Sequence, residues 1–320
     1  MRKIDAARLK KELTGAVGKR LQLASIAQNA APVRLRNRDS RKAIARLLGS
    51  EVPELAKARK GFATILAADA AQSAVRVKKA NAEAQRNVRA SRPGLKRAIA
   101  ERIKAMKTLA AQPAVAGSAQ YYFLDKPFLI WPTLGLQMDD AAYVSANSWA
   151  KAHATASDVN SFVGLRFYYL WTNPHDAYSV INIGGFLILN GTCQASAGGG
   201  FWPSDRYSKL SLDAKLEIYE WWNQPPTSPV PQMDQSINVV TLEANQEGFS
   251  EVGDIEFKSI FRAYGLSYSL MLVPPLATVV FAFNASFSST NGTDSSQTIV
   301  DFATGNFQIG CPYGLVTLLS

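Results

Sequence analysis

Residues of the kinds that bind metal ions or act as nucleophiles are scarce in this sequence. Its 320 residues include two histidines and two cysteines. His153 and His175 have no second histidine at ligand spacing, so no HExxH zinc motif is present. Cys193 and Cys311 are too far apart for a short-spaced zinc motif, and whether they form a disulfide stays open. We therefore expect no cofactor and no metal site.

The motifs of several common enzyme classes are also missing. No G-x-S-x-G nucleophile elbow and no GxxxxGK[ST] phosphate loop occurs. Three consecutive glycines in SAGGGFWPSDR (196–206) are not followed by a phosphate-binding lysine, and we interpret this stretch as a loop. A carboxylate pair for glycoside hydrolysis is defined by its separation in space, which a sequence does not show. We expect that the chain is not an enzyme.

Long hydrophobic runs are absent. No stretch reaches the roughly 18 apolar residues that a membrane-spanning helix needs. The nearest, LMLVPPLATVVFAF (270–283), is interrupted by Pro274 and Pro275. The N-terminus, MRKIDAARLKKELTGAV, is charged throughout and lacks the apolar core of a secretory signal. We expect a chain that is soluble or part of a particle, in a compartment that the sequence does not define.

Aromatic residues are almost absent from the first 110 residues, where Phe62 is the single example. All six Trp, all eleven Tyr and fourteen of the fifteen Phe follow. Charge divides at the same place: residues 1–110 contain 27 Lys and Arg against 8 Asp and Glu, whereas residues 111–320 contain 8 against 17. The net charges are +19 and −9. Such asymmetry indicates a basic arm that meets an anionic partner.

The basic part consists mainly of strong helix formers, above all Ala, Arg and Lys. Pro53 stands at a position that tolerates proline early in a helix. We expect a helix from there to about Ala90, a break at Ser91 and Pro93, and a second helix beyond. Apolar residues in the second helix recur at spacings of three or four and form one stripe. This apolar stripe consists of Leu95, Ile99, Ile103 and Met106.

The acidic part changes to alternation with a period of two, which is typical of β-strands. The clearest case is YSKLSLDAKLEIYEWW (207–222), in which we expect Glu217 and Tyr219 on the solvent face. Its expected core face consists of Leu210, Leu212, Ala214, Leu216 and Ile218. The stretch SFVGLRFYYLW (161–171) is apolar on both faces, as a central strand would be.

Two further alternating stretches predict strands, and two dipeptides predict turns. One strand is expected to place Leu266, Tyr268, Leu270 and Leu272 on one face. The other is expected to place Val279, Phe281, Phe283, Ala285 and Phe287 on one face. Asn-Gly is a strong tight-turn signal, and it occurs at 190–191 and at 291–292.

About eight to ten strands separated by turn signals, without helical patterns between them, predict an antiparallel sandwich of jelly-roll type. The fold class is thus α+β and multidomain. We expect a basic, Ala-rich helical module for docking or oligomerisation at residues 1–112. An acidic, jelly-roll-like antiparallel β-sandwich domain follows at residues 113–320.

Aromatic side chains near one end of the 207–222 strand form a candidate ligand-binding patch. Exposed aromatic clusters on a sandwich are typical of sugar or partner binding. The alternative is that these rings belong to the core or to a subunit interface, because a bulge at Glu220 would turn them inward. The candidate residues are Trp202, Tyr207, Tyr219 and Trp221.

The stretch RASRPGLKRAIAERIKAMK (89–107) sets seven cations against one carboxylate, Glu101. Its candidate residues for binding an anionic partner are Arg89, Arg92, Lys96, Arg97, Arg102, Lys104 and Lys107. A solvated helix face is the plain alternative, but a net +19 exceeds what solubility requires.

Three anionic partners are open for this stretch. The lack of aromatic residues disfavours base stacking but leaves salt-dependent phosphate contacts open. A membrane needs bulky apolar residues opposite the charges, and few are present. We expect an acidic protein surface first, non-specific nucleic-acid contacts second and a membrane last.

These observations favour a non-enzymatic structural or assembly protein. The helical module would mediate self-association or docking on acidic sandwich surfaces of neighbouring copies, as a homo-oligomer, and the sandwich would form a shell, tube or surface head. The alternative is a capsid-like virion protein whose basic arm neutralises nucleic acid. Weaker alternatives are a membrane-active protein and a carbohydrate-binding protein. The sequence does not define the oligomeric number or the ligand.

Overall fold

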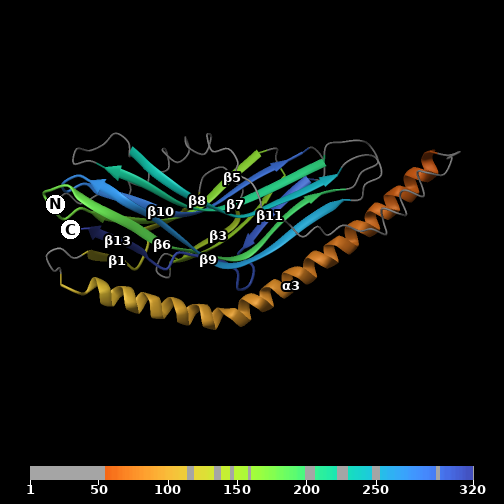
Figure 1. Cartoon of the computed structure of the whole chain (residues 1–320). Helices are drawn as coiled ribbons and strands as arrows, with labels where there is room; N and C mark the ends of the chain where they lie inside the picture. Colours follow the sequence, from red (N-terminus) through yellow and green to blue (C-terminus); the bar gives the residue numbers. More distant parts are fainter. Residues whose placement is uncertain are drawn as a thin grey trace.

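A long helix followed by two packed antiparallel β-sheets makes up the protein (Figure 1). The computed structural model describes residues 55–113, 119–132, 138–144, 148–157, 160–198, 206–221, 230–246, 253–292 and 296–319. The fold class expected from the sequence is confirmed: a basic helical segment precedes an antiparallel sandwich of two sheets. The proposed boundary at 112/113 stays a prediction, although the helix ends at Ala110 and the first strand begins at Gln120.

The helix α3 (Leu55–Ala110) continues through Pro93, so the expected break at Ser91 and Pro93 is wrong. Proline inside a helix removes one hydrogen bond and costs roughly 3 kcal/mol. The Ala-rich sequence on both sides of Pro93 favours the helix. The ring of Pro93 is exposed to solvent, so it does not clash with the sandwich. Figure 1 shows that the helix bends in its middle, as a proline inside a helix requires. The helix is bent rather than divided.

The first sheet has eight strands. β6 and β9 pair along almost their whole length and dominate it. The order is β1-β13-β6-β11-β4-β12, with β3 beside β4 and β9 beside β6. Its strands are β1 (Gln120–Leu124), β3 (Met138–Val144), β4 (Trp149–Ala156), β6 (Ser179–Ala197), β9 (Asp254–Val273), β11 (Ser296–Phe302), β12 (Gln308–Gly310) and β13 (Gly314–Leu319).

The second sheet has five strands in the order β2-β5-β10-β7-β8, and all its pairings are antiparallel. Several strands are far longer than the usual five or six residues, which gives the sandwich the elongated shape seen in Figure 1. Its strands are β2 (Leu129–Pro132), β5 (Asn160–Thr172), β7 (Arg206–Trp221), β8 (Val230–Gln246) and β10 (Thr278–Asn291).

The main core lies between the two sheets, where the expected inward faces of β7 and β10 meet. The expected sets from Leu210 to Ile218 and from Val279 to Phe287 are all buried, so these predictions are confirmed. At its centre Tyr169 stacks on Phe281 at 5.6 Å between ring centroids, and Phe283 lies edge-on to Tyr169 at 5.9 Å. The strand expected to be central, β5, lies between β2 and β10.

The expected alternation of β9 fails at its end. Leu266 is buried, but Leu270 is 70% exposed and Leu272 is also exposed, while Met271 and Val273 face the core. A β-bulge opposite Asn182 adds one residue to β9, and Leu270 adopts φ 61° there. Because side chains alternate with a period of two, one inserted residue exchanges the two faces of the strand.

The expected turn at Asn190-Gly191 is also wrong. Both residues lie inside β6, paired with β9 on one side. A Cβ atom at Gly191 would lie 2.4 Å from the carbonyl oxygen of Asp301 and 2.5 Å from the ring of Phe302. The glycine therefore permits the close approach of β11 rather than a reversal of the chain. At the second dipeptide Asn291 is the last residue of β10 and pairs with Ser208, and residues 293–295 lie outside those described, so the turn expected there stays a prediction.

Two buried carboxylates join the sheets where β8 and β9 lie side by side. Glu256 Oε2 accepts the backbone N–H of Glu243 at 2.7 Å, and Asp254 Oδ2 accepts that of Asn245 at 3.4 Å. Backbone donors on an edge strand are otherwise open to pairing with another chain. The two carboxylates satisfy these donors and close this side of the sandwich.

Gly191→Ala tests the close approach of β6 and β11. We expect it to lower the free energy of unfolding by about 1–3 kcal/mol, because the backbone oxygen of Asp301 must move. The matched control is Gly184→Ala in the same strand, where the nearest atom to a new Cβ lies at 3.8 Å. Urea denaturation of both variants provides the comparison, and equal midpoints for the two would contradict the packing described.

Candidate functional site

The side-chain amide of Gln85 holds α3 on the loop between β11 and β12. Gln85 Nε2 donates to the carbonyl oxygen of Thr304 at 2.6 Å, and its Oε1 accepts the backbone N–H of Asn306 at 3.2 Å. Gly305 between them has φ +60°, and a Cβ there would lie 2.8 Å from Gln85 Oε1. A glycine in this left-handed conformation lets the loop receive the helix closely.

Small and apolar side chains form the rest of this contact. Ala84 and Val88 are buried with Phe307 in a separate cluster. Further along the helix, the guanidinium of Arg102 lies 4.0 Å from the ring centroid of Phe186, a cation–π arrangement. The expected apolar stripe of Leu95, Ile99, Ile103 and Met106 is half-buried. The helix therefore lies on the sandwich with its apolar face toward it.

The seven expected cations divide into two sets. Arg92, Arg102 and Lys107 contact the sandwich of the same chain. Arg92 Nη1 donates to Asn306 Oδ1 at 2.8 Å, and Lys107 Nζ lies 3.9 Å from Asp125 Oδ2. The Lys107 pair is more than half exposed and contributes at most about 1 kcal/mol. The other four are exposed, and they are Arg89, Lys96, Arg97 and Lys104. Of these, Arg97 pairs with Glu101 at 2.9 Å.

The expected aromatic patch is not brought together by the described residues. Tyr219, expected in solvent, is 1% exposed, so that prediction is wrong: it lies on the same face of β7 as Glu217, but it packs there with Tyr168, Val280 and Ala282. Tyr207 is half-buried. Trp202 lies outside the described residues, and for Trp221 the structure describes only the strand backbone.

Glu217 was likewise expected in solvent and is buried instead, in an ion pair with Arg166 of β5. The pair is bidentate, with Nε–Oε2 at 2.7 Å and Nη2–Oε1 at 3.0 Å. Asn284 Nδ2 donates to Oε1 at 2.8 Å, and the Tyr219 hydroxyl donates to Oε2 at 3.1 Å. The cluster lies on the side of the five-stranded sheet that faces away from the main core.

The charges in this cluster are stable at neutral pH. Burial alone would raise the pKa of Glu217, but the charge of Arg166 and the hydrogen bonds from Arg166, Asn284 and Tyr219 outweigh it and hold that pKa below its ordinary value. Burial acts to lower the pKa of Arg166, yet Glu217 holds it above its ordinary value. General acid–base catalysis needs a pKa near the working pH. Both shifts lead away from neutrality, which indicates a structural ion pair.

Buried Asn173 connects two loops at one end of the sandwich. Its Nδ2 donates to the carbonyl oxygens of Ala177 at 3.0 Å and Pro274 at 2.9 Å. Its Oδ1 accepts the backbone N–H of His175 at 3.1 Å and the hydroxyl of Ser179 at 3.0 Å. Both ends of the amide are used, so the loop before β6 and the loop after β9 form one rigid unit.

Four large apolar side chains gather on this rigid unit and are exposed. Tyr178 is 63% exposed and Leu270 is 70% exposed, and Leu272 and Leu276 are each more than half exposed. Leu270 and Leu272 of β9 are both exposed while Met271 between them is buried, so the two leucines share the outer face of the sheet; Tyr178 directly precedes β6, and Leu276 lies in the loop after β9. We refer to Tyr178, Leu270, Leu272 and Leu276 as the apolar end.

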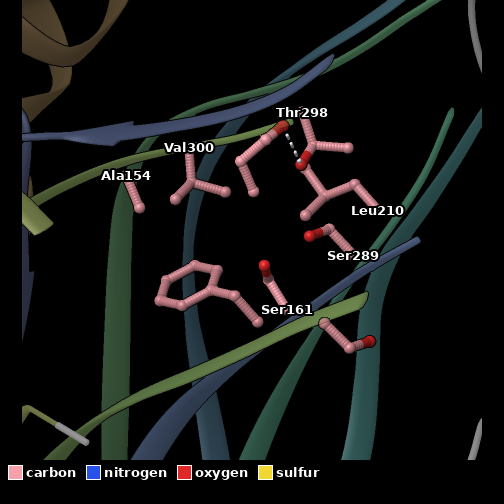
Figure 2. Close-up of a pocket in the computed structure, with 9 residues that line it drawn as sticks. Ala154, Ser161, Leu210, Ser289, Thr298 and Val300 are labelled. Atoms are coloured by element: carbon pink, nitrogen blue, oxygen red, sulfur yellow. Dashed lines mark hydrogen bonds between the residues drawn. The ribbon is translucent and has the colours of Figure 1, made fainter. Parts of the chain in front are cut away.

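A small pocket opens between the two sheets elsewhere (Figure 2). Ala154, Leu210, Phe287 and Val300 supply apolar walls, and the hydroxyls of serine and threonine side chains supply the polar atoms. Its empty volume is about 240 Å³, solvent at its mouth included. Small-molecule sites usually measure roughly 300–1,000 Å³. The described lining residues carry no ionisable group, so this pocket is a gap in packing rather than a built site.

Cys193 and Cys311 are both free and buried. Burial raises the pKa of Cys311 to about 12, although hydrogen bonds to Tyr169 and to the backbone of Tyr313 oppose the shift. Burial also raises the pKa of Cys193. Thiols that stay protonated are poor nucleophiles. Among the residues described, no three His, Cys, Asp or Glu side chains lie together as metal ligands would.

The described part of the chain contains no helix with the length and apolar character needed to cross a membrane. Sequence reasoning missed Arg166 and Asn284 because their roles depend on cross-strand register, which alternation does not show. It also missed three exposed cations of α3, Lys78, Lys79 and Arg86. Placing the cations of residues 55–110 at 100° per residue would have shown that these three share a side of the helix with Arg89, Lys96 and Lys104.

Comparison with known proteins yields no match to a family model and no match to a curated protein. Among solved structures, TmCBM61 in complex with β-1,4-galactotriose has 8% identity and a TM-score of 0.21, over 66% of this chain and 92% of that one. The bacteriophage CBA120 tailspike protein 4 enzymatically active domain has 14% identity and a TM-score of 0.21, over 62% and 21%. The structure of the infectious bursal disease virus Gx strain has 9% identity and a TM-score of 0.16, over 61% of this chain and 41% of that one. At these values the likeness concerns the fold alone and carries no argument about activity.

Glu217→Gln tests the buried ion pair. We expect it to lower the free energy of unfolding by about 3–5 kcal/mol at pH 7, because Arg166 is left buried without its counter-charge. The double variant Arg166→Met with Glu217→Leu removes both charges and should cost less than the single substitution. Urea denaturation measures all three proteins. A double variant that is less stable than Glu217→Gln would contradict this account.

The same pair predicts a pH dependence. The pKa of Glu217 is lower in the folded chain than the unfolded value of about 4.3. The pair therefore contributes its full stability above that value and loses it as the pH falls through the lower, folded pKa. Stability of the wild type should fall more steeply than that of Glu217→Gln below pH about 4, measured by urea denaturation at each pH. Parallel curves would exclude Glu217 as the titrating group.

Proposed function

We propose that this chain is a non-enzymatic structural protein that self-associates, with α3 as an arm and the sandwich as the body of a shell, tube or surface head. The observation that carries the proposal is the length of the helix relative to its docking surface. The named contacts of α3 with its own sandwich begin at Ala84. The preceding part, from Leu55, is about 44 Å long at 1.5 Å per residue.

Figure 1 shows this first part of α3, in orange, projecting past the end of the sandwich. A single helix in water gains most of its stability from packing. In this part of α3 Phe62, Asp69 and Ser73 are already buried, whereas Val75 is 67% exposed, so the surface left for a partner is the one around Val75. The Ala-rich sequence of α3 permits close approach to such a partner. An arm of this kind reaches a neighbouring copy in a head-to-tail contact, which repeats to give a ring or an open assembly.

The apolar end supplies a second surface for the same purpose. Contiguous exposed apolar side chains on a soluble protein mark sites of association. Here Leu270 and Leu272 stand at the end of β9, and Tyr178 and Leu276 stand on the two loops that Asn173 connects, so association would not have to order them first. A second copy of this chain is the partner to which we assign the apolar end.

A capsid-like protein is the second candidate function. The observation that favours it is the outward set of cations on α3, which the sandwich of the same chain leaves unused. The carbohydrate-binding alternative has no such support, because Tyr219 of the expected aromatic patch is buried.

Self-association predicts that purified full-length protein at micromolar concentration and low salt is larger than one chain in light scattering. Replacing the apolar end by Leu270→Asn, Leu272→Ser and Leu276→Asn should weaken this association by about 100-fold or more, since each buried leucine contributes about 1.5–3 kcal/mol. Asparagine tolerates the positive φ of Leu270 and Leu276, so the fold should be retained.

The matched control replaces two other exposed aromatic residues, Phe128→Ser and Phe261→Ser, which lie away from the apolar end. It should associate as the wild type does. A wild-type protein that is strictly monomeric under these conditions contradicts the proposed function. Equal weakening by the control and the triple variant would remove the apolar end from the proposal.

A further inference from the structure

The cations that α3 turns away from the sandwich lie in one line. Six of them are exposed, and their charged groups form no ion pair or hydrogen bond with the side chain of any other described residue. At about 100° per residue, these six fall within roughly 100° of the helix circumference. We refer to them as the basic stripe: Lys78, Lys79, Arg86, Arg89, Lys96 and Lys104.

We propose that the basic stripe binds the phosphate backbone of nucleic acid without regard to sequence. The stripe runs for about 39 Å at 1.5 Å per residue. A duplex presents one phosphate charge per about 1.7 Å of its axis, so many phosphates lie within reach along this length. Ala82 and Ala100 lie between the cations at the same helical angle, and their small side chains allow the backbone to approach closely.

An acidic protein surface is the poorer partner, because the described carboxylates of the sandwich are largely engaged inside it. Glu217 pairs with Arg166, and Glu243 pairs with Lys209. Three others accept backbone N–H groups: Asp254, Glu256 and Asp301. The net −9 of residues 111–320 is thus not an open acidic face in the part of the sandwich that the structure describes.

A lipid surface is the poorer partner for a different reason. A helix that lies on a membrane needs a free apolar face opposite its charges. In α3 that face is turned to the sandwich, where Ala84 and Val88 contact Phe307. Of the large apolar side chains described on α3, Val75 is the one that is strongly exposed. The basic stripe therefore lacks the large apolar side chains that would insert into lipid.

The stripe also predicts how nucleic acid is bound. It contains no aromatic side chain, so base stacking contributes nothing and phosphate contacts carry the affinity. Such contacts release counterions, and the logarithm of the affinity falls with the logarithm of the salt concentration by about 0.9 per phosphate contact on a duplex. This inference does not rest on self-association, because a monomer presents the whole stripe.

Fluorescence anisotropy with a labelled DNA duplex and full-length protein, freed of nucleic acid in high salt, tests the stripe. The variant Lys79→Gln, Arg86→Gln, Lys104→Gln keeps good helix formers at each position. We expect its salt slope to be smaller by up to about 2.7, and its affinity at 0.1 M salt to be about 100-fold lower. Two duplexes of unrelated sequence should bind the wild type about equally.

The matched control is Lys126→Gln, Lys258→Gln, Arg262→Gln, which removes three exposed cations from the sandwich. It should bind nearly as the wild type does. An unchanged salt slope in the stripe variant, or an equal loss in the control, would overturn the proposal. Light scattering of the stripe variant distinguishes duplex binding from self-association. A variant that no longer self-associates but still binds the duplex would assign the stripe to protein contacts instead.

Vesicles of phosphatidylserine and phosphatidylcholine distinguish lipid from nucleic acid. Sedimentation should leave the wild-type protein in the supernatant at physiological salt, while the duplex is bound under the same conditions. Binding to vesicles without binding to the duplex would overturn the proposal in favour of a membrane surface. Binding to neither would show that the stripe is a solvated helix face.

Discussion

The rotation of α3 about its own axis decides which of its side chains contact the sandwich and which face solvent. Gln85 contacts two backbone groups of one loop, and Ala84 and Val88 pack on Phe307 beside it. Because each residue of a helix is turned by about 100° from the last, one fixed face fixes every other. The apolar stripe then falls on the sandwich and the basic stripe falls in solvent. Docking uses Arg92, Arg102 and Lys107 but leaves the six cations of the basic stripe in solvent, open to another partner.

Most of the described carboxylates of the sandwich serve contacts inside it rather than the basic stripe of α3. In the sandwich, carboxylates replace missing backbone partners at the β8–β9 edge and neutralise Arg166 between strands. Each such contact is worth more in a buried place than an exposed pair such as Lys107 with Asp125. The acidic half is therefore acidic for reasons of its own stability.

Patterns of period two and 3.6 were sufficient to predict the two kinds of structure, the core faces of β7 and β10, and the apolar stripe of α3. They failed where one residue changed the register. The bulge opposite Asn182 exposes Leu270. Tyr219 lies on the predicted face of β7, with Glu217, but it is buried there because that face is packed rather than open to solvent. Alternation also could not show that Gly191 serves a close contact, because that contact comes from Asp301, far along the chain.

Backbone strain is concentrated at the apolar end. Leu270 and Leu276 have φ values of 61° and 56°, and the left-handed conformation costs a non-glycine residue about 1–2 kcal/mol. Asparagine at either position would cost less and would not expose a large apolar side chain. Asn182 Oδ1 accepts the N–H of Leu270 at 2.8 Å and so helps to hold the strained bulge. Neither leucine benefits the isolated sandwich, and strain of this kind marks functional surfaces. Two strained, exposed leucines at this end of the sandwich support an apolar end made for contact with another molecule.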